Sequence, residues 1–319
     1  MPQKMRVSNQ REYNEFLKKR GNVFHFVNQA IENWYENSPK VAGGNNTYSD
    51  KVVILIHIIV HLFRIGLRQA VGFVKGYMVQ IGKKLKIISY TQASRRFKKL
   101  NLKIDDHRSN KDDLENVEIA VDSTRVSIYN NNGGHSKLNI RKRKYSGYGQ
   151  VRKLHVVLNI NDKKAISMNY TSGVAVDYLP VCDMLEEVSD KYNICSIRAD
   201  AAYDIKSVYK ECRKYNIVPI IRPRKDTKIC LADYLSERNK YISRIRSYEN
   251  YEDGINEWKK KVKYGARSYI EVFFYRLKQI FGFGLKNKSE VNREKELLIK
   301  CYLLNKFTDI GMAKFKLAA

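Results

Sequence analysis

The 319-residue sequence has few acidic residues, with 33 Asp and Glu against 60 Lys and Arg and a formal net charge of +27. Such an excess repels itself in a compact fold, and proteins typically use it to attract nucleic acid or an anionic surface. The basic residues are spread along the whole chain, so we expect a folded protein that lies against a long polyanion. The apolar content of 43% is enough for a large core and argues against disorder.

Cysteine is scarce, and long apolar runs are absent. The five cysteines are odd in number and form no C-x-x-C pair, which argues against a disulfide framework or a zinc site and fits a reducing cytosolic setting. The most apolar segment, 52–67, is interrupted by His57, His61 and Arg64. A membrane span needs about twenty residues, so this segment predicts a buried helix and no membrane partner.

The first third of the chain has apolar residues at helical spacing, interrupted at VAGGNNTYSD. We expect residues 1–105 to form an N-terminal all-helical domain that binds DNA, for which a helix-turn-helix is one suitable arrangement. Arg95 and Arg96 lie in its last stretch, SYTQASRRFKKLNL. Their basic face is equally compatible with a solvated surface and with DNA contact. A polar, acidic linker is expected at 106–116.

From residue 117 the apolar period changes from that of a helix to that of a strand. We expect three strands at 117–129, 152–161 and 165–173. A helix (176–192), a strand (194–200), a helix (203–215) and a strand (216–223) follow. An irregular charged insert at 225–260 and a last helix at 266–281 complete the order. Three antiparallel strands followed by alternating helices and strands predict an α/β fold. Ribonuclease-H-like domains have this mixed sheet flanked by helices.

Three acidic residues stand where this fold would bring them together. Asp122 ends the apolar part of the first strand, and Asp200 ends the strand at 194–200. Glu271, in the last helix, is the only acid among nine basic residues between 259 and 288. If the first and fourth strands are neighbours, both aspartates lie at one edge of the sheet. Each aspartate alone is also a common turn former, and Glu271 is also placed for an ordinary i, i−4 ion pair with Arg267.

Close carboxylates need a compensating charge. Two of them repel by roughly 4 kcal/mol at about 4 Å and an effective dielectric of about 20. Magnesium binds carboxylates together with substrate phosphate oxygens, and two ions about 3.5–4 Å apart promote phosphodiester displacement. The sequence therefore predicts that Asp122, Asp200 and Glu271 hold magnesium ions, a pair by this chemistry, beside DNA phosphates.

The last helix predicts two distinct faces. At about 100° per residue, Arg267, Lys278 and, if the helix extends back that far, Tyr264 share one stripe with Glu271. A simple ion pair between Arg267 and Glu271 explains neither Tyr264 nor Lys278. A separate apolar arc is expected to pack on the sheet and consists of Ile270, Phe273, Phe274, Leu277, Ile280 and Phe281.

The spacing Tyr264, Arg267, Glu271, Lys278 reproduces Y-(2)-R-(3)-E-(6)-K. It resembles the signature of DDE transposases of prokaryotic insertion sequences of the large fourth-and-fifth group. AVDST and ADAAYD, around the two aspartates, resemble the family's first and second catalytic motifs, although the second commonly has glycine where alanine stands here. GLRQAVGF and SYTQASRRFKKL also resemble its N-terminal region.

The resemblance implies a ribonuclease-H-like catalytic core, at 117–224 and 261–319, whose metal ligands are Asp122, Asp200 and Glu271. It implies magnesium- or manganese-dependent hydrolysis at the ends of the element, followed by attack of the freed 3′-hydroxyl on target DNA. Arg267 and Lys278 would hold phosphates, and Tyr264 would contact the same strand. The implied partners are double-stranded terminal inverted repeats, target DNA and a second copy of the chain, in the nucleoid of a prokaryotic cytoplasm. A related nuclease without strand transfer and an inactive DNA-binding relative are the alternatives.

Two further segments are candidates for DNA contact. The stretch 137–153 carries seven basic residues and no acid, including Arg141, Lys142, Arg143 and Lys144. As a loop beside the metal site it would bind DNA backbone, and the alternative is a solvated charged loop. Trp258, in the insert at 225–260, is a candidate for stacking on a flipped base, with ordinary packing as the alternative.

Overall fold

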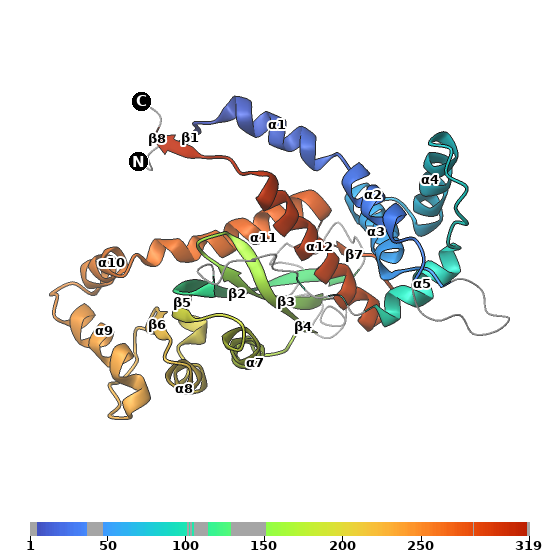
Figure 1. Ribbon diagram of the computed structural model, residues 1–319. Coiled ribbons are helices and arrows are strands. Elements are labelled where there is room, and N and C mark those ends of the chain that lie inside the picture. The colour runs from blue at the N-terminus through green and yellow to red at the C-terminus, as the bar shows by residue number, and fades with distance from the viewer. Residues whose placement is uncertain are drawn as a thin grey trace, which may run out of the picture. The chain divides into compact units, whose positions relative to one another are not determined.

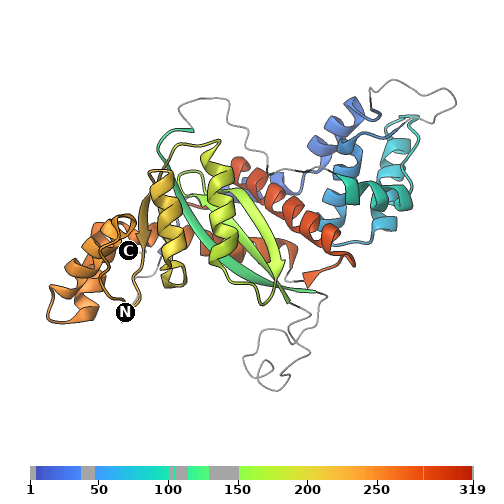
Figure 2. The same ribbon diagram turned by 90° about the horizontal axis from the view of Figure 1, so that it is seen from below.

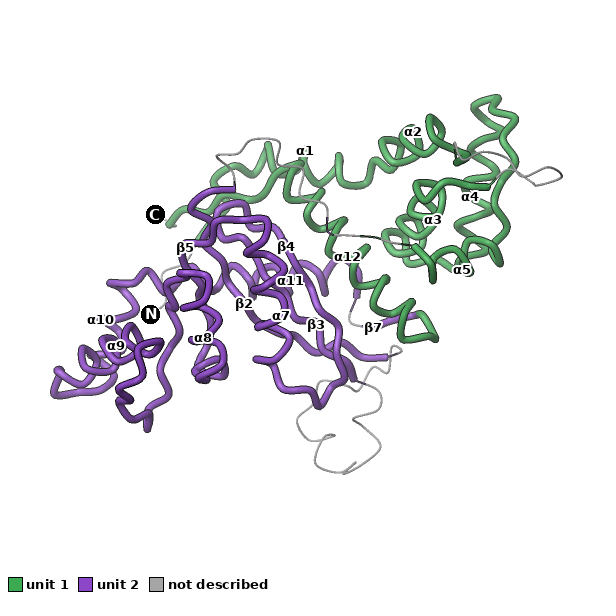
Figure 3. The backbone as a smooth tube through the Cα atoms, turned by 60° about the horizontal axis from the view of Figure 1, so that its bottom comes forward, with its two compact units in different colours: residues 1–103, 287–319 green, residues 104–286 purple. Residues whose placement is uncertain are grey.

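The computed structural model describes residues 5–36, 47–100, 102, 104, 114–128, 151–282 and 284–317. The chain divides into two compact units, coloured separately in Figure 3. Unit 1 comprises residues 1–103 and 287–319, and unit 2 comprises residues 104–286. Most of the linker predicted at 106–116 lies outside the described residues.

Unit 2 is built on a six-stranded mixed sheet. In spatial order its main strands are β4 (Lys164–Ser172), β3 (Val151–Asn159), β2 (Val117–Ile128), β5 (Ile194–Ala199) and β6 (Val218–Ile221), and the short β7 (Gly284–Leu285) also pairs with β2. Strand β3 is antiparallel to its neighbours β2 and β4, whereas β5 is parallel to β2 and to β6. The expected ribonuclease-H-like α/β fold is confirmed.

Helices cover both faces of this sheet. Figures 1 and 2 show α7 (Tyr178–Ser189) and α8 (Lys206–Lys214) on one face and α11 (Ser268–Phe281) on the other. Val117, Ile119 and Val121 of β2 join the core beneath α7 and α8. Since successive side chains of a strand point to opposite faces, Asp122 lies on the face covered by α11. The predicted apolar arc of α11 is buried except for Ile280, which is half-buried.

The insert at 225–260 is helical, so the expectation of an irregular segment was wrong. It contains a 3₁₀ turn, η4 (Asp233–Leu235), and two helices, α9 (Ser236–Arg246) and α10 (Tyr251–Lys261). Each helix buries only a narrow apolar strip amid charged residues, which hides the helical period in the sequence. The two helices approach closely at Gly254, where an added Cβ would lie 2.2 Å from the carbonyl oxygen of Ile245.

Unit 1 is mainly helical. Its helices are α1 (Gln10–Arg20), α2 (Phe24–Glu32), α3 (Asp50–Leu62), α4 (Leu67–Gln80), α5 (Tyr90–Lys99) and α12 (Glu290–Ile310). The apolar segment at 52–67 forms most of α3, which is buried as expected. None of the helices in the described part of the chain combines the length and apolar character needed to cross a membrane.

Two features of unit 1 differ from the sequence expectation. The N-terminal region is helical as expected, but it also includes the short strand β1 (Met5–Val7), which pairs antiparallel with β8 (Phe315–Leu317). The end of the segment 261–319, assigned to the catalytic core, lies in unit 1, where α12 packs on α3 and α5. Both differences depend on pairing between segments from opposite ends of the chain, which local periodicity does not report.

A buried imidazole lies in the core of unit 1. The ring of His57, on α3, stacks on that of Phe97, on α5, with the ring centroids 3.6 Å apart. Burial lowers the pKa of His57 from 6.5 to about 4. Between pH 6.5 and about 4, His57 is therefore neutral in the folded unit and protonated in the unfolded chain.

We expect acid to destabilise unit 1 as the pH falls from 6.5 to about 4, because protonation of His57 favours the unfolded chain. The free energy of unfolding should fall by about 2 kcal/mol between about pH 7 and about pH 5, and His57→Leu should remove this part of the dependence. Urea unfolding, followed through Trp34 fluorescence in a Trp258→Phe background, measures it. An equal pH dependence with and without His57 would contradict this assignment.

Candidate active site

Asp122 lies within β2, and Asp200 directly follows the neighbouring strand β5. In the parallel register of β2 and β5, Ala120 lies opposite Arg198, and each aspartate comes two residues after its member of this pair. The two carboxylates interact electrostatically. The expectation that the first and fourth strands are neighbours is therefore confirmed, and it brings two of the three predicted acids together.

Asp122 is largely enclosed. Its side chain is 19% exposed; one oxygen accepts the Ser123 backbone N–H at 2.8 Å, and the other accepts Nη1 of Arg267 at 3.0 Å. Burial raises the pKa of Asp122, and the charge of Asp200 raises it further, whereas the two hydrogen-bond donors lower it. The net effect is a raised pKa, because the two donors and the charge of Arg267 only partly offset burial and the charge of Asp200.

Asp200 has a structural contact as well. It precedes a 3₁₀ turn, η3 (Ala201–Tyr203), and its Oδ1 accepts the Ala202 backbone N–H at 2.8 Å. The turn-forming role that the sequence left open is thus present. Its Oδ2 makes no hydrogen bond to any residue in the described ranges. One carboxylate oxygen therefore orients the side chain while the other is available to a ligand.

Arg267 connects the acids. Besides Asp122, its guanidinium donates through Nη2 to Glu271, whose side chain is 55% exposed. Burial by itself lowers the pKa of Arg267, but the charges of Asp122, Glu271 and Asp200, together with Tyr264, outweigh it and the pKa is raised. The ordinary i, i−4 ion pair considered for Glu271 is therefore present, and the same arginine also contacts the first acid.

The three carboxylates do not converge directly in this arrangement. Within the described ranges, no group of three or more His, Cys, Asp and Glu side chains is placed to hold a metal ion. Arg267 lies between Asp122 and Glu271 and supplies a compensating charge itself, and the three-acid metal site stays a prediction. The donor chemistry nevertheless fits a hard divalent cation, which prefers carboxylate oxygens. The neighbouring aspartates also repel each other, and such a cation would neutralise their charge.

Tyr264 is not part of the last α-helix, so the predicted stripe is interrupted. It begins a 3₁₀ turn, η5 (Tyr264–Arg267), directly after Lys263, whose φ of 50° is left-handed. The Tyr264 hydroxyl donates to the backbone oxygen of Ala199 at 2.9 Å, next to Asp200, and burial raises its pKa to about 12. Lys278 is half-buried on α11, and burial lowers its pKa.

Two family models match the chain. Both are described as transposase DDE domain; one matches residues 114–305 and the other residues 18–131. The chain belongs to the DDE transposase family. Among solved structures, it matches the Drosophila P element transposase strand transfer complex at 10% sequence identity and a TM-score of 0.33, over 89% of this chain and 86% of that one.

Trp258 is a core residue of this transposase. It is 1% exposed and belongs to the apolar cluster that joins the insert to β6. Its ring lies against those of Tyr241 and Tyr264, with centroids 5.5 and 5.1 Å away. The packing interpretation fits this position, whereas the base-stacking candidate would need an accessible ring. Trp258 instead supports Tyr264, which contacts the backbone beside Asp200.

The predicted basic contacts differ in their surroundings. Arg141, Lys142, Arg143 and Lys144 lie outside the described residues. On α5, Arg96 forms ion pairs with Glu36 and Asp50, whereas Arg95 is exposed and lines a groove of about 640 Å³.

The same groove contains two residues that the sequence analysis did not single out. The guanidinium of Arg68 lies 4.4 Å from the ring centroid of Tyr90. In the sequence, Arg68 and Tyr90 each stand near the start of a helical stretch that resembles the family's N-terminal region, and this position could have indicated them.

A second polar network adjoins Asp122 and was also missed. The Asp177 carboxylate accepts the Ser123 hydroxyl at 2.8 Å and Nζ of Lys153 at 2.9 Å. His155 lies beside it, fully buried, with Nε2 2.9 Å from the Thr171 hydroxyl. Residues 123, 153 and 155 come from the paired strands β2 and β3. Only the strand register brings them together, so no sequence motif indicated the network.

We expect Trp258 to remain enclosed when DNA is added, because its ring is packed in the core. The chain has two tryptophans, and Trp34→Phe leaves Trp258 as the remaining one. Its fluorescence should resist acrylamide quenching and should not change on addition of a short DNA duplex. The same variant unfolded in urea provides the fully quenched reference. Strong quenching of Trp258 by the duplex would restore the base-stacking assignment.

Proposed function

We propose that this DDE transposase binds the terminal inverted repeats of a prokaryotic insertion sequence, cleaves the DNA ends by metal-dependent hydrolysis and joins the 3′-hydroxyl ends to target DNA. The observation that carries the proposal is the meeting of Asp122 and Asp200 beside the segment that bears Arg267 and Glu271. The family to which the chain belongs supports it as well. Transposition would take place in the prokaryotic cytoplasm.

Asp122, Asp200 and Glu271 are the residues that would hold two Mg²⁺ or Mn²⁺ ions. When bound, such ions would activate the attacking oxygen and stabilise the leaving one in phosphodiester displacement. Arg267 has to leave the carboxylates for this to happen. A DNA phosphate is a suitable new partner, because guanidinium groups bind phosphates through two parallel hydrogen bonds. Arg267 would then position the strand that is cut, with Lys278 and Tyr264 near it.

The remaining basic residues would bind DNA away from the acids. We assign the helices of unit 1 to recognition of the inverted repeats, with Arg95 and Arg68 contacting phosphates at the groove on α4 and α5. The basic stretch that includes Arg141, Lys142, Arg143 and Lys144 would follow the DNA backbone. Two copies of the chain would assemble on paired ends.

Neutralising any of the three acids should abolish cutting and leave DNA binding intact. For Asp122→Asn, Asp200→Asn and Glu271→Gln we expect cleavage to fall by about 10²–10⁴-fold, the range for losing a positioned acid–base or charge-stabilising group. The assay incubates the chain and Mg²⁺ with duplexes that carry the inverted repeats flanking its gene. The matched control is Asp233→Asn, which neutralises an exposed carboxylate that pairs with Arg213. Near-parental cutting by any acid variant would remove that residue from the site.

The products of the same assay separate the three functions. Joined products with target DNA indicate transposition, and cleavage without joining indicates a nuclease. Binding without either indicates an inactive relative.

Arg95 and Arg96 should differ in their contribution to DNA affinity. Removing one side chain that binds a phosphate should reduce the slope of log K against log salt by about 0.9. We expect this for Arg95→Gln, because Arg95 is exposed in the groove, and not for Arg96→Gln, because Arg96 pairs with Glu36 and Asp50. Fluorescence anisotropy over a range of salt concentrations measures the slopes. Equal slopes for the two variants would place the DNA elsewhere on unit 1.

A further inference from the structure

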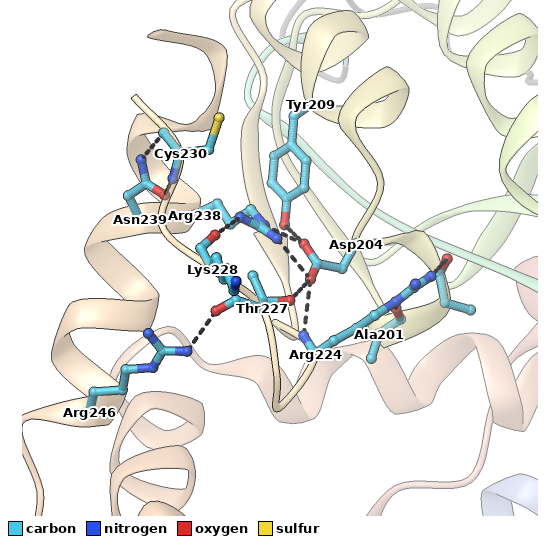
Figure 4. Close-up of polar contacts among 11 residues, drawn as sticks. Ala201, Asp204, Tyr209, Arg224, Thr227, Lys228, Cys230, Arg238, Asn239 and Arg246 are labelled. Carbon is cyan, nitrogen blue, oxygen red and sulfur yellow. Dashed lines mark hydrogen bonds and ion pairs between the residues drawn. The ribbon is translucent and has the colours of Figure 1, made fainter. Parts of the chain in front are cut away.

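A second aspartate follows Asp200 closely in the sequence and has very different surroundings. Asp204 directly follows the η3 turn that Asp200 precedes, and its side chain is fully buried. Figure 4 shows the contacts of its carboxylate. The donors are Nε of Arg238 at 2.6 Å, the Tyr209 hydroxyl at 2.9 Å, the Arg224 backbone N–H and the Thr227 hydroxyl at 3.0 Å, and Nη2 of Arg238 at 3.5 Å.

These contacts exclude Asp204 as a further ligand of a metal ion. An ionised carboxylate has about four lone-pair sites, and protein donors already surround both of its oxygens. Burial by itself raises the pKa of Asp204, but the hydrogen bonds from Arg238 and the Arg224 N–H outweigh it, and the pKa is lowered. Asp204 is thus an ionised, fully hydrogen-bonded group whose role is to hold other residues in place.

The same network holds the backbone between the two aspartates. The Arg224 side chain donates to the carbonyl oxygens of Ala201 and Ala202, at 3.0 and 3.3 Å (Figure 4). The Ala202 N–H in turn donates to the Asp200 carboxylate. A displacement of the turn would therefore move the N–H group that orients the side chain of Asp200.

The insert supplies much of this network. Arg238 lies on α9, and it also donates to the backbone oxygen of Lys228 at 3.1 Å. Arg246, further along α9, donates to the backbone oxygen of Thr227 at 2.6 Å. The segment 224–230 is thereby tied to α9 on one side and to Asp204 on the other (Figure 4).

We propose that Asp204 is a positioning residue, through which the insert at 225–260 fixes the turn after β5 and hence the direction of the Asp200 carboxylate. Asp204 touches neither DNA nor metal in this role, and it acts through Ala202 and Asp200. The relevance to catalysis rests on the proposed function, whereas the effect on the turn does not. The insert is then a part of the catalytic architecture and not an appendage to it.

The direct test measures the turn itself. In Asp204→Asn, Arg238 keeps its charge but loses its carboxylate, so amide hydrogen exchange of the peptide spanning 200–204 should accelerate by about 10-fold or more. Exchange in β2 should stay unchanged. Ile242→Ala, which removes a buried side chain of α9 without touching the network, controls for loss of stability in the insert. An unchanged turn in Asp204→Asn, or equal acceleration throughout the sheet, would overturn the proposal.

The catalytic test uses the cleavage assay on inverted-repeat duplexes. Asp204→Asn should lower kcat by about 10–100-fold, the usual cost of removing a residue that orients a metal ligand, and KM for DNA should stay within about 3-fold, since the proposed contacts to DNA are elsewhere. Arg238→Lys should retain part of the rate because it keeps one charged donor to Asp204.

The outcomes distinguish this inference from the proposed function. A parent chain that cuts, with Asp204→Asn cutting equally well, would refute the positioning role alone. A parent chain that never cuts, in which Asp204→Asn still frees the turn, would refute the proposed function and leave the structural role of Asp204 standing.

Discussion

The charge balance around Arg267 is the constraint on which the site depends. The fold places Asp122 beside Asp200 in a largely enclosed position, where two like charges are unfavourable. In this structure the guanidinium of Arg267 provides the compensation and also pairs with Glu271. The site is therefore built around a positive charge. In the proposed reaction, metal ions would replace the guanidinium of Arg267 beside the carboxylates, and the guanidinium would move to a DNA phosphate.

The strand order makes this charge balance necessary. Because β5 runs parallel to β2, Asp122 within β2 and Asp200 directly after β5 come at neighbouring positions of the sheet. The alternation of side chains then sets the face. Val121 and Ala199 join the core beneath α7 and α8, so the residues that follow them lie on the opposite face, where α11 carries Glu271. An ordinary apolar core on one face thus determines where the acids stand on the other.

The insert contributes to the same site by two routes. Trp258 of α10 packs against Tyr264, whose hydroxyl holds the backbone at Ala199. Arg238 of α9 binds Asp204 at the other end of the turn that follows Asp200. Both routes lead to the residues on either side of the second proposed catalytic acid. A segment with little periodicity in its sequence is therefore closely tied to the centre of the proposed chemistry.

The sequence alone determined the main strands of the sheet in unit 2 and the helices that flank it, since alternation and helical spacing report which residues meet the core. It also indicated the three acids and their signature, because the spacing typical of the family is present. Three things were decided only by tertiary structure. The helices of the insert bury narrow apolar strips that local patterns do not reveal. Tyr264 lies outside α11, in a 3₁₀ turn, because the chain turns at Lys263. The pair of Arg267 with Glu271 follows from the i, i−4 spacing, but its contact with Asp122 depends on a distance in space that no spacing along the chain specifies.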